Sequence, residues 1–248
     1  MALKIDIFPC LTDNYGYLVR DEASGQVAAL DAPEASKIIA RAEALGWTID
    51  YILNTHWHPD HCGGNADLKA HFGCPNYGPA EIEEKWGVDH IIAPGETFYL
   101  GETALDIIDL YGHTLGLIAY IDRAGGNAFI SDCIFPLGCG RRFEGTPQQF
   151  WSSLLRLCEL PDETVLWGAH EYALANLKFA ESLGHFPALE TRGADIRDRR
   201  EAGQFTVPST LAEEKATNPF LVYPMREDGF EAQAAKFAEL RAAKDDFK

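Results

Sequence analysis

Several features are missing from this sequence of 248 residues, and each absence excludes a class of protein. No window holds the roughly 18 consecutive apolar residues that a membrane-spanning helix needs. None of the six cysteines forms a Cys-x-x-Cys pair, which argues against a zinc knuckle and against a thioredoxin motif. The N-terminal stretch is interrupted by Asp6 and Pro9 and has no small-residue cleavage site. We therefore expect no signal peptide, reduced cysteines and a cytoplasmic location.

Positive charge is also scarce. The sequence has 21 Lys and Arg residues against 38 Asp and Glu residues, which gives a formal net charge of −17. A surface this acidic repels nucleic-acid backbones and anionic membranes, so we expect neither as a partner. A small anionic substrate would have to bind where the basic residues cluster.

The first two thirds of the chain alternate between segments typical of strands and segments typical of helices. Strands are expected over 17–19, 27–30, 51–53, 105–110, 117–121, 128–130 and 165–167, and helices over 35–45 and from Thr146 onward. Few strand signals follow residue 167, and helices are expected over 172–183, from Thr210 onward and over 232–243. The sequence predicts an α/β catalytic domain over 1–170 followed by a helical domain over 171–248.

The segment Thr55–His61, Thr-His-Trp-His-Pro-Asp-His, places four metal-binding side chains directly after a predicted strand. His56 and His58 are two residues apart, so they point the same way in an extended chain. Asp60 and His61 follow where the chain turns. We infer two sets of ligands that face two adjacent points. The simpler alternative is a surface loop that happens to be rich in histidine.

Three further side chains follow predicted strands in the same way, namely His113, Asp132 and His170. Residues placed just past strand ends converge at one edge of a sheet, where functional sites form. Taken singly, each has an ordinary explanation as a hydrogen-bonded turn residue or a helix cap. Together with the histidine-rich segment they predict a metal site.

The ligand chemistry fits two divalent transition-metal ions. Histidine nitrogen and carboxylate oxygen suit zinc, iron and manganese, and zinc is the metal that we expect. One ion would bind His56, His58 and His113. The other would bind Asp60, His61 and His170, and Asp132 would bridge the two ions. A water held between two ions loses a proton near neutral pH, because metal binding lowers its pKa from 15.7 to about 7. The resulting bridging hydroxide would act together with Asp60 and Asp132 as the catalytic carboxylates.

The histidine-rich segment resembles the Thr-His-x-His-x-Asp-His signature of the metallo-β-lactamase superfamily. Within that superfamily the chain is similar, almost end to end, to the glyoxalase II (hydroxyacylglutathione hydrolase) family. The matching blocks are Asp13–Tyr15, Tyr17, Gly112–Gly116, Gly138–Arg141, Phe143–Thr146, Gly168–Tyr172, Asn176–Ala180, Pro208–Phe220, Arg241, Lys244–Asp245 and Phe247–Lys248. The first signature alone indicates only a large superfamily, whereas the later blocks are far more specific.

The resemblance implies a four-layered αββα sandwich followed by a helical domain that binds glutathione. It implies hydrolysis of S-(2-hydroxyacyl)glutathione, chiefly S-D-lactoylglutathione, to glutathione and a 2-hydroxy acid such as D-lactate, a step in methylglyoxal detoxification. The seven metal ligands carry over without a gap, and the glutathione contacts map to Arg141, Phe143, Tyr172, Arg241 and Lys244. We expect a monomer with a small-molecule partner, and a dimer stays open.

The sequence departs from the family pattern at five positions. Leu117 stands where the family has a second histidine, and Cys133 replaces the threonine after the bridging aspartate. Arg142 is charged where an apolar residue is expected, Val222 replaces an arginine, and Phe143 lacks a tyrosine hydroxyl. These changes put the fine tuning of the metal site in doubt.

Three other functions compete with the hydrolase. A glutathione-persulfide dioxygenase shares the superfamily signature but uses a single iron, and the complete second ligand set argues against it. A nuclease is disfavoured by the net charge of −17. A non-catalytic thiol or metal binder is supported only by Leu117 and Cys133. The pair Arg241 and Lys244 is three residues apart on one helix face, and its simpler interpretation is a solvated surface that pairs with Glu239 or Asp245.

Overall fold

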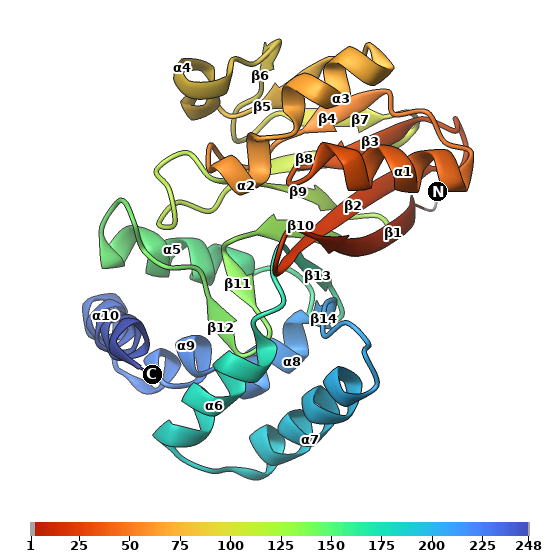
Figure 1. The fold of residues 1–248 in the computed structure, drawn as a ribbon. Coiled ribbons are helices and arrows are strands. Elements are labelled where there is room, and N and C mark those ends of the chain that lie inside the picture. The colour runs from red at the N-terminus through yellow and green to blue at the C-terminus, as the bar shows by residue number, and fades with distance from the viewer. Residues whose placement is uncertain (1–2, 248) are drawn as a thin grey trace. The chain divides into compact units, whose positions relative to one another are not determined.

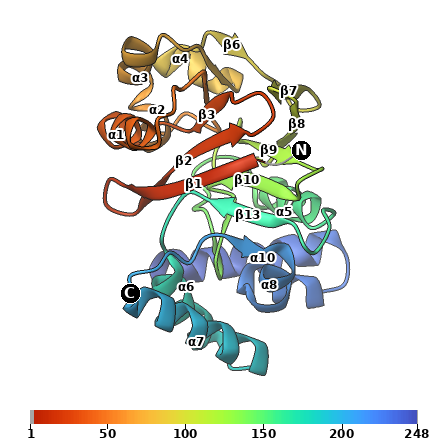
Figure 2. The same ribbon diagram turned by 90° about the vertical axis from the view of Figure 1, so that its right-hand side faces the viewer.

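The computed structural model describes residues 3–247, which form two compact units. Unit 1 comprises the residues up to 109 together with 116–130, and unit 2 comprises 110–115 together with 131 onward. Figures 1 and 2 show the elements of both units. The domain boundary at 170 that the sequence predicts stays a prediction.

The first sheet of unit 1 has six strands, in the order in which they occur in the chain. They are β1 (Leu3–Cys10), β2 (Asn14–Asp21), β3 (Val27–Leu30), β4 (Tyr51–Leu53), β5 (Asn76–Gly78) and β6 (His90–Ile91). The first three strands pair antiparallel, and β3 to β6 pair parallel. Parallel neighbours need crossover connections. These are α1 (Ala35–Leu45), α2 (Pro59–Cys62), α3 (Asn65–Phe72), the 3₁₀ turn η1 (Ala80–Ile82) and α4 (Glu83–Trp86).

Helix α1 covers one face of this sheet (Figure 2). Its buried residues Ile38 and Ala42 are four apart, so they lie on one side of the helix. They belong to a core cluster that includes Leu18 and Ile52 from the sheet. The helix ends at Gly46, whose φ of 68° is a left-handed conformation that glycine adopts without steric cost.

Unit 1 also holds four antiparallel strands, which form a meander. They are β7 (Thr97–Leu100), β8 (Thr103–Asp109), β9 (Ile118–Asp122) and β10 (Asn127–Ser131). Aromatic side chains join these strands to the first sheet. The ring centroids of Tyr51 and Phe98 lie 5.2 Å apart, and those of Tyr17 and Phe129 lie 6.5 Å apart. Unit 1 is therefore built of a helical layer and two packed layers of strands.

Unit 2 is mostly helical. Its helices are α5 (Pro147–Leu157), α6 (Ala173–Leu183), α7 (Pro187–Glu201), α8 (Leu211–Thr217), α9 (Pro219–Val222) and α10 (Phe230–Asp246), with the 3₁₀ turn η2 (Pro224–Arg226). Its strands are the hairpin β11 (Ile134–Phe135) and β12 (Gly138–Cys139), and the antiparallel pair β13 (Val165–Gly168) and β14 (Ser209–Thr210). Stacked and edge-on contacts among Phe150, Phe179, Phe220 and Phe237 join four of the helices.

Several sequence predictions are confirmed by these elements. The α/β class is correct, and α1 and β4 have the predicted bounds. The hydroxyls of Thr146 and Thr210 cap α5 and α8, each accepting from the backbone N–H three residues on. Helix α10 is longer than predicted at both ends. Helix α7 occupies a segment in which the sequence showed only high charge, because its polar residues leave no strong apolar period.

Two further findings concern the described residues as a whole. No helix within 3–247 combines the length and the apolar character needed to cross a membrane. All six cysteines are free thiols, and five of them are buried.

Candidate active site

The histidine-rich segment connects β4 to α2. His56 is fully buried, and its Nε2 lies 3.0 Å from Nδ1 of His58. His58 is the extended N-cap residue of α2, and Pro59 follows it at the first helical position, where a proline fits. Asp60 and His61 then lie in the single turn of α2. The turn that the sequence predicts after His58 is thus a short helix.

Asp31 supports this segment, although the sequence analysis did not single it out. One Asp31 oxygen lies 2.8 Å from Nδ1 of His61 and also accepts from the Thr55 hydroxyl, and the other accepts from the Thr55 backbone N–H. A carboxylate at Nδ1 fixes the ring and leaves Nε2 for a metal. Asn14 also donates to a carboxylate oxygen of Asp60 at 3.1 Å. Asp31 comes directly after the apolar strand β3. A polar residue at a strand end is the signal that indicated His113, and it could also have indicated Asp31.

The three ligand candidates of unit 2 lie together. Asp132 Oδ2 is 3.2 Å from Nε2 of His113, and Oδ1 is 3.3 Å from Nε2 of His170. Asp132 therefore presents one oxygen to each histidine, as a bridging carboxylate would. A Cβ at Gly140 would lie 2.0 Å from the Asp132 carbonyl oxygen and 3.0 Å from Nδ1 of His113, so only glycine fits there.

The hairpin β11–β12 joins Asp132 to the loop that carries Arg141, and buried polar side chains hold it. Asn218 donates to the carbonyls of residues 135 and 138, and Asn176 donates to that of residue 136. The carboxylate of Glu214 accepts from the N–H of Leu137. Burial raises the pKa of Glu214 despite the nearby Arg192. These bonds satisfy the backbone groups of a buried turn.

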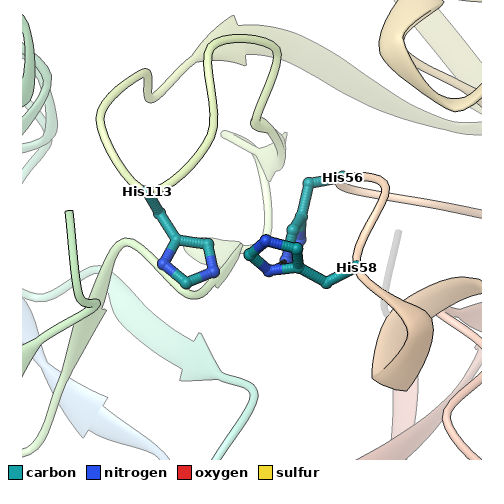
Figure 3. Close-up of side chains that lie close together, drawn as sticks. All are labelled: His56, His58 and His113. Atoms are coloured by element: carbon teal, nitrogen blue, oxygen red, sulfur yellow. Dashed lines mark hydrogen bonds between the residues drawn. The ribbon is translucent and has the colours of Figure 1, made fainter. Parts of the chain in front are cut away.

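Potential ligand atoms gather in three groups. The ring nitrogens of His56, His58 and His113 lie within 4.8 Å of one another, and Figure 3 shows the three rings close together. Ligand atoms of Asp60, His61 and His170 lie equally close. A third group of the same kind joins Asp31 to His56 and His61. Nitrogen and carboxylate donors without a thiolate fit zinc, iron or manganese, and not a soft metal.

The predicted glutathione contacts are all in unit 2. Phe143 is 57% exposed, and its ring centroid lies 5.3 Å from that of His113. Tyr172 stacks on His170 at 4.8 Å with nearly parallel rings. Both aromatic rings thus lie against metal-ligand candidates.

The two cations of α10 differ in exposure: Arg241 is buried and pairs with Asp245, as the simpler interpretation of the sequence allowed, whereas Lys244 is half-buried. Arg241 is only 8% exposed, and it donates to the carbonyl of Cys139 at 2.9 Å and to Asp245 at 3.0 Å. Lys244 donates to the carbonyl of Ala175 at 2.9 Å. Partial burial and the neighbouring charge of Arg241 lower the pKa of Lys244 to about 8.

The departures from the family pattern have simple structural settings. Leu117 and Cys133 are fully buried, and burial raises the pKa of the Cys133 thiol far above its usual range. Arg142 donates to the carbonyl of Gly145 at 2.8 Å. Val222 is the last residue of α9. None of the four is among the grouped ligand candidates.

Two protein families match consecutive parts of the chain. Residues 22–170 match the metallo-beta-lactamase superfamily, and residues 171–247 match the family described as hydroxyacylglutathione hydrolase C-terminus. A hydroxyacylglutathione hydrolase of Erythrobacter litoralis is 46% identical over 99% of this chain and 100% of its own length. The chain belongs to the hydroxyacylglutathione hydrolase family. Relatives of the same name from Hyphomonas neptunium and Rhizobium meliloti are 45% and 42% identical, with at least 99% of each sequence covered.

Solved structures agree on the fold. The chain is similar to ETHE1 from Myxococcus xanthus, with a TM-score of 0.71, 22% identity, and 97% of this chain and 91% of that chain covered. It is also similar to TTHA1623 in a di-iron-bound form, with a TM-score of 0.62, 25% identity, and 88% and 100% covered. The resemblance predicted from the sequence is therefore confirmed, and with it the metallo-β-lactamase fold, the helical C-terminal part and the assignment as a hydrolase.

Proposed function

We propose that this protein hydrolyses S-(2-hydroxyacyl)glutathione thioesters, with S-D-lactoylglutathione as the principal substrate, to glutathione and a 2-hydroxy acid. The full-length relatives carry the name of this activity at 42–46% identity. The observation that carries the proposal is the presence of two complete groups of nitrogen and oxygen ligands in such a chain. One group would serve a mononuclear enzyme, and the second adds the donors for another ion.

The first ion would be held by His56, His58 and His113, and the second by Asp60, His61 and His170, with Asp132 shared. Two divalent ions would activate a water as nucleophile and stabilise the oxyanion that forms on the thioester carbonyl. Zinc is our first choice of metal, with iron or manganese as the alternatives that the same donors accept. The di-iron form of the relative that is 25% identical supports two ions in such a fold.

The residues of the chain have separate tasks in this reaction. Asp132 faces two histidines and would contribute a ligand to both ions. Asp31 and the carbonyl of Arg141 hold His61 and His113 by their Nδ1 atoms, so that each Nε2 is left as a ligand. The leaving thiolate needs little acid assistance, because an ordinary thiol has a pKa near 8.5.

Substrate capture would use the cations and aromatic rings of unit 2. Arg141, Arg241 and Lys244 supply positive charge in a chain whose net charge is −17. Phe143 and Tyr172 lie against His113 and His170, next to the reacting carbonyl in our proposal. We also propose a catalytic domain over 1–170, a glutathione-binding domain over 171–248, a cytoplasmic location and action as a monomer.

The test is a thioester-cleavage assay with S-D-lactoylglutathione, combined with elemental analysis of the purified enzyme. We expect turnover that is lost on chelation and restored by zinc, iron or manganese, with about two ions bound per chain. A single iron, no thioester cleavage and oxygen uptake with glutathione persulfide would replace the hydrolase by a dioxygenase. Gel filtration of the same sample tests the monomer.

A further inference from the structure

One carboxylate oxygen in unit 2 is shared by two guanidinium groups. Oδ1 of Asp245 lies 3.2 Å from Nε of Arg141 and 3.0 Å from Nη2 of Arg241. Arg241 and Asp245 are four residues apart on α10, whereas Arg141 belongs to the loop after β12. A single acceptor thus joins two cations from distant parts of the sequence.

The surroundings of this oxygen are strongly cationic. Arg142, Arg241 and Asp245 line a small cavity of about 90 Å³. Lys244 follows Arg241 by one helical turn, and part of the depression of its pKa comes from the Arg241 charge. Like charges at such separations repel each other, so the cations need an acceptor between them to stay together.

The two arginines are anchored to different degrees. Arg241 is held without Asp245, because it is buried, donates to the carbonyl of Cys139 and lies 5.1 Å from the centroid of the Phe220 ring. The Arg141 side chain is 57% exposed, and it otherwise approaches only the ring of Phe143, at 5.8 Å, among the described residues. Asp245 therefore determines the place of Arg141 far more than the place of Arg241.

We propose that Asp245 is a positioning residue, which holds the guanidinium of Arg141 beside that of Arg241 so that the pair can receive a carboxylate of the substrate. This inference rests on the proposed function, since it assumes that the cations bind a glutathione thioester. Asp245 acts through the arginines and needs no contact with the substrate. Arg141, Arg241 and Lys244 together outweigh the single charge of Asp245, so the cluster stays positive.

If Asp245 acted through its charge alone, its removal would change substrate binding in the opposite direction from that expected for a positioning residue. If Asp245 merely neutralised a cation, or occupied the site in competition with the substrate, its removal would make the cluster more positive and would tighten the binding of an anion. If Asp245 positions Arg141, its removal frees an exposed side chain and weakens binding. The sign of the change in KM separates the two roles.

The experiment compares Asp245→Asn with Asp246→Asn, its neighbour on α10, which removes the same charge without touching either arginine. With S-D-lactoylglutathione we expect Asp245→Asn to raise KM roughly two- to fivefold, the range of a partly exposed ion pair, with kcat nearly unchanged. Asp246→Asn should leave KM the same or slightly lower. A small thioester without carboxylates should be cleaved equally by wild type and both variants, which also reports intact folding.

Two further variants complete the test. Asp245→Glu keeps the charge and should restore most of the affinity, and Asp245→Asn should add little to Arg141→Ala, because both remove one interaction. A KM that falls or stays constant in Asp245→Asn overturns the proposal. Calorimetry with the thioether S-hexylglutathione gives the same comparison without turnover. If the wild type cleaves no glutathione thioester, the proposed function fails while this binding comparison still decides the role of Asp245.

Discussion

Nδ1 of His113 lies 2.8 Å from the backbone carbonyl oxygen of Arg141. A carbonyl only accepts, so this hydrogen bond puts the proton of the neutral imidazole on Nδ1 and leaves Nε2 as a ligand. The side chain of the same Arg141 reaches Asp245. One residue therefore orients a proposed metal ligand with its backbone and takes part in the proposed substrate cluster with its side chain.

The shared position of Asp132 leads to the first prediction. Asp132→Asn should lose bound metal and thioesterase activity together, because an amide cannot compensate the charge of two neighbouring cations. Elemental analysis and the S-D-lactoylglutathione assay on the same sample measure both losses. The circular dichroism spectrum should stay close to that of the wild type. A variant that keeps two ions and near-normal turnover would show that Asp132 does not bridge.

Asp31 gives the second prediction. Asp31→Asn should weaken metal binding by roughly 10- to 100-fold, because one amide oxygen cannot replace both carboxylate oxygens, which accept from Thr55 and from Nδ1 of His61. Competition with a chromophoric chelator measures this affinity. Asp122→Asn is a matched control, since Asp122 is also buried but accepts from the N–H of Gly125 in the turn after β9. Equal affinities in both variants would rule out a supporting role for Asp31.

The third prediction concerns Arg241. Charge-assisted hydrogen bonds contribute about 1.5–3 kcal/mol each, so Arg241→Ala should raise KM for the glutathione thioester by roughly 10- to 100-fold and lower kcat far less. The effect should vanish with a small thioester that lacks carboxylates. Because Arg241 also donates to the carbonyl of Cys139, the melting temperature should fall as well. An unchanged KM would leave Arg241 with a structural role alone.

The lowered pKa of Lys244 leads us to expect that KM for the glutathione thioester depends on pH. Its pKa is lowered to about 8, so the ammonium loses its proton as the pH rises through that value. A neutral amine no longer attracts a carboxylate, and KM for the glutathione thioester should therefore increase between about pH 7 and 9. Burial and the Arg241 charge cause this shift, whereas the nearby thiol of Cys139 has a pKa of about 11 and does not titrate in this window. Lys244→Arg should remove the increase, because guanidinium stays charged; a slope that persists in this variant would assign it to another group.

The cap of α5 gives a prediction for stability. Thr146→Ala removes the hydroxyl that accepts from the N–H of Gln149, and it should cost about 1 kcal/mol of unfolding free energy. Urea denaturation measures the change. Thr191→Ala is the control, because Thr191 lies inside α7, where alanine is the better helix former. Equal stabilities of the two variants would contradict the capping role.

Local signals were sufficient to predict many elements. Helix α1 is bounded by a clear apolar stripe and Gly46, and α5 by Thr146 and Pro147. Strand β1 was missed because Asp6 and Pro9 interrupt its apolar residues. It is an edge strand, where a proline is tolerated since one side of the strand needs no ladder hydrogen bond.

The ligand candidates could be predicted because strand ends place polar residues at one edge of a sheet. The supporting residues could not, since their roles depend on tertiary contacts between distant segments. Asp31 reaches His61 across 30 positions, and Asp245 reaches Arg141 across 104. The burial of Arg241 is also a tertiary effect. It continues the stripe of Phe237 and Leu240 on α10, where a charged residue is expected to face solvent.

The free cysteines have a consequence for an enzyme whose proposed product is itself a thiol. Burial is the main cause that raises the pKa of every one of the six, to about 12 for Cys10 and about 11 for Cys139 and Cys158. Exchange with a disulfide proceeds through the thiolate, and a thiol that is protonated and shielded from solvent reacts slowly. Accumulating glutathione disulfide would therefore form mixed disulfides only slowly at the five buried cysteines, and half-buried Cys158 would be the first to react.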